Sequence, residues 1–140
     1  MIDTLIMVGS ESDEAFLHEG LKYLQVNQVS HEVIITSTHR KPRETAEKIV
    51  DVMRNEGFRV AICGAATATG LPGVIAGYLR ETNIPIFGVR FTKEPGQSII
   101  EDATFNLSSM PSGVPLAYTG YNEKGFMNAC VLAARITMSR

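Results

Sequence analysis

The residues of this 140-residue chain best suited to chemistry stand together at positions 37–41, in the order Ser-Thr-His-Arg-Lys. His39 carries an imidazole, which titrates near neutral pH and can take up and release a proton during a reaction. Arg40 offers a planar guanidinium that suits a phosphate or a carboxylate, and Ser37 adds a hydroxyl. The segment predicts proton transfer beside an anionic ligand. The alternative is an ordinary solvated loop that happens to contain a histidine.

A second polar segment, Gly-Ser-Glu-Ser-Asp at positions 9–13, follows the first apolar run of the chain. Gly9 permits a tight turn, and Ser10, Ser12 and Asp13 all belong to the residue types that cap helices. Capping needs only one of them, so the others are available to a ligand. A helix N-terminus suits a phosphate, whereas the charge of Asp13 suits ribose hydroxyls better. The alternative is a helix cap without a ligand.

A third segment, Gly-Ala-Ala-Thr-Ala-Thr-Gly-Leu-Pro-Gly at positions 64–73, contains no ionisable side chain. Its glycines allow unusual backbone angles, and its small side chains let a ligand approach main-chain N–H groups closely. We therefore expect a backbone cradle for the ligand. Its expected contacts are Gly64, Ala65, Ala66, Gly70 and Leu71. The alternative is a tightly packed turn between a strand and a helix.

Strands and helices are expected to alternate along the whole chain. Short apolar runs predict parallel strands at residues 5–8, 32–36, 60–63, 84–89 and 114–119. Helices are predicted after residue 13, from Pro42, over 72–79 and over 124–138, with one short helix near Ile99 in the poorly patterned region 90–109. This alternation is typical of an α/β domain with a central parallel sheet and helices on both faces.

The apolar faces of the helices follow from their spacing. The expected buried residues are Leu17, Leu21 and Leu24 in the first helix, Ala46, Ile49, Val50 and Met53 in the second, and Met127, Val131 and Ala134 in the last. Polar or small residues follow the predicted strands at 9–13, 37–41, 64–70 and 119–122. Because ligands of open parallel sheets bind beyond the carboxyl ends of the strands, we expect these four loops to form one pocket.

Composition excludes several classes of protein. The length fits one domain over residues 1–140 with a single buried core, and the net charge of −2 gives no basic field for nucleic acid. Glycines and Pro72 interrupt the uncharged run 60–79, so it predicts no membrane span. The apolar core of the N-terminal segment is too short for a signal peptide. Cys63 and Cys130 stand in apolar runs and are expected to be buried, reduced thiols, which favours a cytoplasmic location.

Common cofactor and metal motifs are absent from the sequence. Neither G-x-G-x-x-G nor a P-loop occurs, and no spacing of His, Cys and Asp suggests a metal site, so we expect no cofactor and no metal. His18 lies in a predicted helix and His31 at a strand start, and both are expected to be structural or on the surface. The residues alone therefore predict a small α/β domain that binds a phosphorylated, ribose-like ligand near one acid/base histidine.

Five motifs, in this order, resemble the PurE family: VGSESD (8–13), STHRKP (37–42), GAATATGLPG (64–73), SSMPSGVPL (108–116) and NACVLAARI (128–136). The resemblance covers most of the chain and implies a three-layer flavodoxin-like subunit that assembles as a homo-octamer with shared active sites. It also implies a phosphoribosyl aminoimidazole substrate and a carboxylate derived from CO2 or bicarbonate. The implied reaction forms 4-carboxy-5-aminoimidazole ribonucleotide in de novo purine synthesis. The His-Arg pair at 39–40 resembles the N5-carboxyaminoimidazole ribonucleotide mutases more than the direct carboxylases.

The resemblance also implies roles for individual residues. Ser10, Ser12 and Arg40 would hold the region of the 5′-phosphate, Asp13 the ribose hydroxyls, and His39 would be the general acid/base at the imidazole carbon. The chain departs from the family pattern in the reacting region, with Gly70 in place of a family histidine, Ala66 and Thr67 in place of glycines, and Thr69 in place of an alanine. Two alternatives therefore stay open. One is a PurE-like carboxylase or decarboxylase of another heteroaromatic nucleotide, and the other is a non-catalytic nucleotide-binding paralogue.

Overall fold

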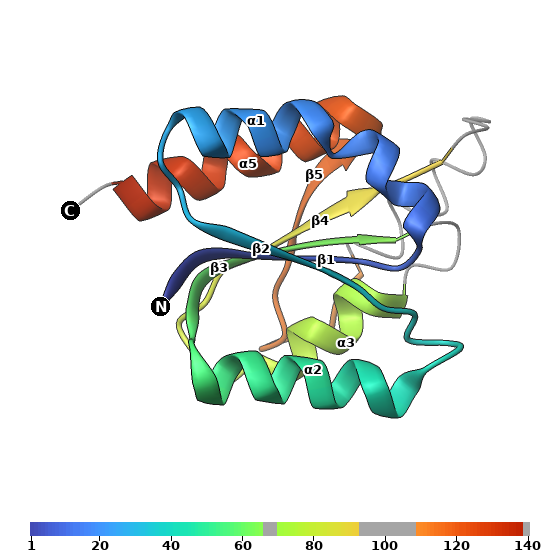
Figure 1. Cartoon of the computed structure of the whole chain (residues 1–140). Helices are drawn as coiled ribbons and strands as arrows, with labels where there is room; N and C mark the ends of the chain where they lie inside the picture. The colour runs from blue at the N-terminus through green and yellow to red at the C-terminus, as the bar shows by residue number, and fades with distance from the viewer. Residues whose placement is uncertain (66–69, 93–108, 139–140) are drawn as a thin grey trace.

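A parallel sheet forms the centre of the protein in a computed structural model that describes residues 1–65, 70–92 and 109–138 (Figure 1). Within these residues the sheet has five strands: β1 (Ile2–Val8), β2 (His31–Ile35), β3 (Phe58–Ala65), β4 (Ile86–Arg90) and β5 (Ala117–Tyr121). The strand order is β2-β1-β3-β4-β5, and every neighbouring pair is parallel. This order is that of a flavodoxin-like fold and confirms the predicted architecture.

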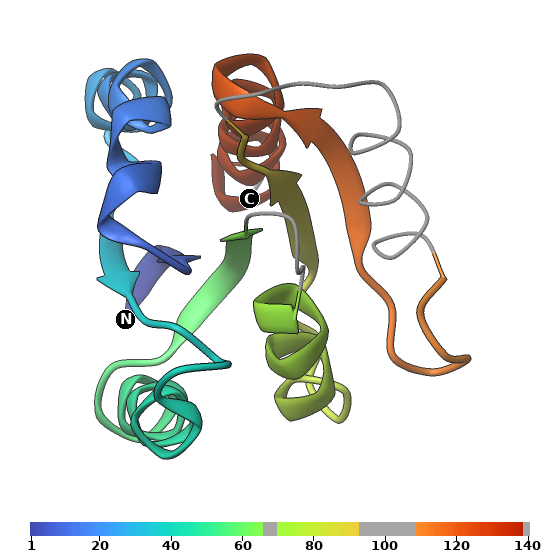
Figure 2. The same ribbon diagram turned by 90° about the vertical axis from the view of Figure 1, so that its right-hand side faces the viewer.

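Helices cover both faces of the sheet, because a sheet buried on two sides needs an apolar layer on each. The helical segments are η1 (Glu11–Phe16), α1 (His18–Val26), α2 (Pro42–Asn55), α3 (Gly70–Tyr78) and α5 (Asn122–Met138). Helices α1 and α5 lie on one face, and α2 and α3 lie on the other (Figures 1 and 2). The predicted helix near Ile99 lies outside the described residues.

The central strands are more deeply buried than the edge strands. Every residue of β4 is buried, as are the last five residues of β1, whereas all five residues of β2 are only half-buried. The apolar run at 32–36 predicted a strand ahead of His39, and this strand is present but is not fully buried in the single chain. The physical reason is that β2 stands at the edge of the sheet, so only β1 pairs with it and its outer side has no neighbouring strand in the described part of the chain.

The first helical region is divided in two. Residues 11–16 form a 3₁₀-helix, and the α-helix begins only at His18. Short-range hydrogen bonds explain the division, since the Asp13 N–H donates to the Ser10 carbonyl oxygen (3.0 Å) and the Leu17 N–H to the Glu14 carbonyl oxygen (3.1 Å). Such i to i+3 bonds tighten the chain before the α-helix starts. Leu17 and Leu24 are buried as expected.

The buried face of α5 includes Ala134 as predicted but differs from the prediction at Met127 and Val131. Its buried residues are Gly125, Phe126, Ala129, Cys130, Ala133, Ala134 and Thr137, whereas Met127 and Val131 are half-buried. The cause is a close approach of α1: a β-carbon placed on Gly20 would lie 2.4 Å from the Phe126 ring and 2.9 Å from the Cys130 sulfur. Glycine and small residues at this contact let the two helices pack, so the small side chains of α5 face inward.

The last strand begins later than predicted, at residue 117 rather than 114. Pro115 has no N–H to donate to a strand ladder, so it cannot extend β5 towards the N-terminus. Val114 and Leu116 instead pack, partly buried, against the apolar cluster on the α2–α3 side of the sheet. The start of the apolar run at 114–119 therefore marks buried loop residues, and the strand is formed by residues 117–121.

The cysteines confirm the expectation of buried, reduced thiols. Cys63 and Cys130 are both free and buried, and they belong to separate apolar clusters. Burial raises the pKa of the Cys130 thiol to about 12 and raises that of Cys63 further still. Both side chains therefore behave as small apolar residues at neutral pH.

The uncharged run at residues 60–79 is divided between β3 and α3, as expected for a strand, a loop and a helix. Among the helices that the structure describes, none is both long and apolar enough to cross a membrane.

Candidate functional site

The carboxyl ends of β1, β2 and β3 bring three polar loops together. Figure 2 looks onto this end of the sheet. Gly9 marks the meeting point, because a β-carbon on it would lie 4.0 Å from the carbonyl oxygens of both Thr36 and Gly64. The Thr36 N–H also donates to the Val8 carbonyl oxygen (2.9 Å). The loops that carry the predicted serines, His39 and the small-residue segment therefore start side by side.

The serine loop has one capping residue and one further exposed hydroxyl. Ser10 caps η1, and its Oγ accepts a hydrogen bond from the Ser12 N–H (3.3 Å). The two Oγ atoms lie 3.0 Å apart, and either can be the donor. The Ser12 side chain is exposed. This arrangement leaves hydroxyl groups at the surface that can donate to an anionic oxygen, as the sequence predicted.

Asp13 takes a different position from its serine neighbours. Its side chain is only 4% exposed, and it interacts electrostatically with Arg90. Arg90, the last residue of β4, is fully buried and donates a hydrogen bond from Nη1 to the Phe91 carbonyl oxygen. Burial lowers the pKa of the Arg90 guanidinium, while Tyr118 and Asp13 act in the opposite direction. Asp13 is therefore buried beneath the exposed serine hydroxyls of the same loop.

Arg90 is the functional candidate that sequence reasoning missed. The strand predicted at 84–89 was expected to end before Arg90, because a charged residue after an apolar run usually indicates the start of a loop. Arg90 instead pairs in register with Ala65 of β3 and Tyr121 of β5. Its position between Val89 and Phe91, both buried, was the available signal.

The loop with His39 is fixed by its backbone. The Ser37 Oγ accepts a hydrogen bond from the Arg40 N–H (3.2 Å), and the Ser37 carbonyl oxygen accepts one from the Lys41 N–H (2.8 Å). The Thr45 hydroxyl donates to the Lys41 carbonyl oxygen (2.9 Å), which ties the loop to α2. The loop therefore holds its main chain in one shape.

The side chains of His39 and Arg40 extend from this loop and are exposed. No acidic side chain within the described ranges pairs with Arg40, whereas Glu44 lies 3.6 Å from the Lys41 Nζ and 3.0 Å from the Lys48 Nζ. The guanidinium of Arg40 can therefore bind an external anion without first breaking an ion pair.

His39 lies against the start of α3. A β-carbon placed on Gly70 would be 2.8 Å from the imidazole Cε1 and 3.0 Å from Nε2. Two predicted site residues that are far apart in the sequence are thus in contact. By contrast, His18 is exposed on α1, and His31 begins β2 with its Nδ1 3.1 Å from the Val29 carbonyl oxygen.

The small-residue segment is described only at its two ends. Gly64 and Ala65 finish β3, and Gly70 and Leu71 begin α3, while Ala66 lies outside the described residues. A β-carbon on Gly64 would lie 2.0 Å from the Phe91 ring, so packing requires this glycine. Leu71 is 2% exposed and belongs to the apolar core, which leaves only its backbone for a ligand.

The fourth predicted loop, at residues 119–122, lies away from His39. It follows β5, and β2 and β5 are at opposite edges of the sheet (Figure 2). Four strand spacings of about 4.8 Å separate the edges by roughly 19 Å. The loop lines a separate cavity of about 340 Å³ together with the start of α5. The prediction that all four loops form one pocket is therefore wrong within the single chain.

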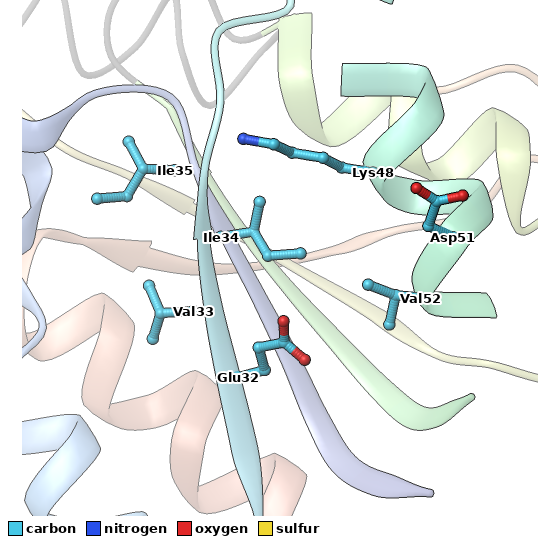
Figure 3. Close-up of a pocket in the computed structure, with 7 residues that line it drawn as sticks. All are labelled: Glu32, Val33, Ile34, Ile35, Lys48, Asp51 and Val52. Atoms are coloured by element: carbon cyan, nitrogen blue, oxygen red, sulfur yellow. The ribbon is translucent and has the colours of Figure 1, made fainter. Parts of the chain in front are cut away.

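A further groove, of about 330 Å³, runs along the edge strand β2 (Figure 3). Its lining residues are Glu32, Val33, Ile34, Ile35, Lys48, Asp51 and Val52. In Figure 3, Glu32 and Ile34 lie on the side of β2 that faces α2. Lys48 and Val52 extend from α2 on that same side of the strand. None of the predicted site residues lines this groove.

Comparisons with known proteins cover nearly the whole chain. A family model described as AIR carboxylase matches residues 3–140. The N5-carboxyaminoimidazole ribonucleotide mutase of Brucella melitensis is 31% identical over 135 residues, which are 96% of this chain and 80% of that protein. The protein of the same name from Pyrococcus abyssi is 34% identical over 131 residues, which are 94% and 71% of the two chains.

The fold is also similar to solved structures. PurE from Treponema denticola has a TM-score of 0.79 at 22% sequence identity, and the match covers 97% of this chain and 80% of that one. At this identity the likeness supports the fold alone. The sequence match over residues 3–140 spans every polar loop described above.

Proposed function

This chain belongs to the AIR carboxylase family, and from that premise we propose that it is an enzyme of purine biosynthesis that converts N5-carboxyaminoimidazole ribonucleotide to 4-carboxy-5-aminoimidazole ribonucleotide. Relatives matched over nearly the whole chain carry the name of this mutase. The observation that carries the proposal is an exposed His39 at the carboxyl edge of the sheet, where its ring lies against the first residue of α3. Proton transfer is the chemistry that such a residue can perform there.

Substrate binding is assigned to the loops around His39. Ser10, Ser12 and Arg40 bind the 5′-phosphate, since exposed hydroxyls and an unpaired guanidinium suit its oxygens. Asp13 accepts hydrogen bonds from the ribose hydroxyls at the floor of the loop. Gly64, Ala65, Gly70 and Leu71 stand beside the reacting ring, where uncharged residues keep water and competing charge away from CO2.

The proton balance of the reaction explains why one histidine is sufficient. The bond from the exocyclic nitrogen N5 to the carboxyl group breaks, which releases CO2 and leaves an electron-rich aminoimidazole. A new bond then forms between the CO2 carbon and C4 of the ring. N5 gains one proton and C4 loses one, so the net exchange with solvent is zero. The imidazole of His39 donates the first proton and removes the second.

Retention of CO2 requires that the ring and the gas stay in contact between the two steps. A positioned pair reacts far faster than free reactants, because its translational entropy has already been lost. In this chain the end of β3 and the start of α3 offer uncharged residues for this purpose.

We also propose that the chain forms a homo-oligomer, as the family resemblance implies. The support is the edge strand β2, whose Val33, Ile34 and Ile35 are half-buried beside the groove of Figure 3. An unpaired, partly apolar edge is a common site of association. Light scattering coupled to size-exclusion chromatography should give the mass of an octamer, and a monomer would contradict the shared active site.

The direct test of the function is an assay of the wild-type chain with each carboxylated isomer supplied separately. We expect interconversion in both directions without added bicarbonate. Formation of product only from aminoimidazole ribonucleotide and CO2 would identify a direct carboxylase instead. Tight binding of both isomers without turnover would identify a non-catalytic paralogue.

A further inference from the structure

We propose that Gly70 is a positioning residue for His39, because the missing side chain at position 70 leaves the space in which the imidazole lies. This inference deepens the proposed function and rests on it for the role of the imidazole, but the contact itself is a property of the structure. The two residues belong to different elements, the loop after β2 and the first turn of α3.

The contact is too close for a side chain at position 70 unless the imidazole moves. A β-carbon on Gly70 would lie 2.8 Å from Cε1 and 3.0 Å from Nε2 of His39, well inside the separation that carbon and nitrogen atoms tolerate. Since the loop backbone is held by Ser37 and by Thr45, the loop cannot easily retreat as a whole. A side chain at position 70 would therefore turn the imidazole about its own torsion angles.

The described residues give the His39 imidazole no hydrogen bond, and its side chain is exposed. Among these residues, Gly70 is one against which the ring lies. The orientation matters, because Nε2 faces α3 at 3.0 Å while Nδ1 is farther away at 3.8 Å from the same point. In this orientation Nδ1 is the ring nitrogen farther from Gly70.

The other glycines of α3 provide an internal comparison. A β-carbon on Gly77 would meet nothing within 4 Å, and one on Gly73 would meet only the end of Met110 at 3.9 Å. Glycine is unfavourable inside a helix, yet packing requires it at only one of these three positions. The requirement at Gly70 comes from His39.

The same geometry explains the departure from the family pattern. The PurE motif has a histidine where this chain has Gly70. A histidine introduced here would occupy the volume of the His39 ring, so Gly70→His is expected to displace the existing imidazole rather than add a second one.

The experiment compares Gly70→Ala with the matched control Gly77→Ala in the same helix. We expect a nuclear Overhauser contact between the His39 Hε1 and the Gly70 α-protons in the wild type and in Gly77→Ala, and its loss in Gly70→Ala. In the mutase assay, Gly70→Ala should lower kcat by about 10–100-fold, because misplacing a catalytic group by about 1 Å can cost about 10²-fold. KM should stay within about twofold, since the phosphate contacts remain.

The two proposals fail in distinguishable ways. If the wild type shows the contact but has no mutase activity, the positioning stands and the proposed function is lost. If the wild type is active and Gly70→Ala keeps the kcat of Gly77→Ala, Gly70 has no positioning role. Absence of the contact in the wild type itself overturns the inference without any variant.

Discussion

Replacing His39 with asparagine is expected to lower the rate of isomer interconversion by about 10²–10⁴-fold, the usual contribution of a positioned general acid/base. Asparagine fills a similar volume and keeps a polar group in the loop, but it neither takes up nor releases a proton near neutral pH. The loop backbone should survive the change, because its hydrogen bonds involve Ser37 and main-chain groups rather than the His39 ring. The loss should therefore appear in kcat.

His18→Asn is the matched control. His18 is also exposed, but it lies at the start of α1, outside the loop that faces α3. It should keep wild-type activity within about twofold, since surface substitutions away from special features have small effects. Substrate affinity measured by calorimetry should change little in either variant. If His39→Asn retains most of the activity, the proton is carried by another group and the assignment of His39 is wrong.

The sheet could be predicted from the sequence because its central strands are buried on both faces. Such strands read as continuous apolar runs, and β1, β3 and β4 were all located in this way. The edge strands were less certain. For β5 the apolar run belongs partly to a loop that packs on the core through Val114 and Leu116, and Pro115 delays the start of pairing.

The orientation of α5 could not be predicted, because it depends on a contact with another element. Spacing alone favoured Met127 and Val131, the larger side chains. The helix instead turns Phe126 and a set of small residues inward, since Gly20 of α1 lets the two helices lie close together at Phe126. Local periodicity shows that a helix has an apolar face, and the neighbouring element decides which of two similar faces is buried.

Part of the site could be predicted for the same local reasons. Polar loops after parallel strands meet at one edge, and Ser10, Ser12, His39 and Arg40 do stand on adjacent loops. Gly64 was expected to be a glycine because it contributes to a backbone cradle for the ligand. In the structure, the Phe91 ring occupies the space that a side chain at position 64 would fill. Contacts across the sheet, unlike turns, leave no pattern in a single sequence.

The interaction of Asp13 with Arg90 is a second contact of this kind. Asp13 begins the first helical region and Arg90 ends the fourth strand, and each could be taken for a surface residue when considered alone. In the fold both are buried, and Phe16 of η1 stacks on Phe91 with ring centroids 5.4 Å apart, which brings the two segments together.

Arg90→Met is expected to lower the free energy of unfolding by about 3–5 kcal/mol, because it removes a buried cation that interacts with the buried Asp13 and so leaves the charge of Asp13 uncompensated. Methionine keeps much of the length and apolar stem of arginine, so the loss is mainly electrostatic. Urea denaturation provides the measurement, through the midpoint at constant slope. Arg80→Met is the control: Arg80 is exposed and only 3.5 Å from the exposed Glu81, so its loss should cost at most about 1 kcal/mol.

The double variant separates the charge from the packing. If Asp13 is the group left uncompensated, Arg90→Met combined with Asp13→Asn should be more stable than Arg90→Met alone, because the neutral amide no longer needs a cation beside it. Equal stability of the single and double variants would mean that Arg90 acts through its hydrogen bond to the Phe91 carbonyl oxygen and its packing. In the proposed function Asp13 binds the ribose hydroxyls, so the comparison also tests whether the attraction between the buried guanidinium of Arg90 and Asp13 supports that contact.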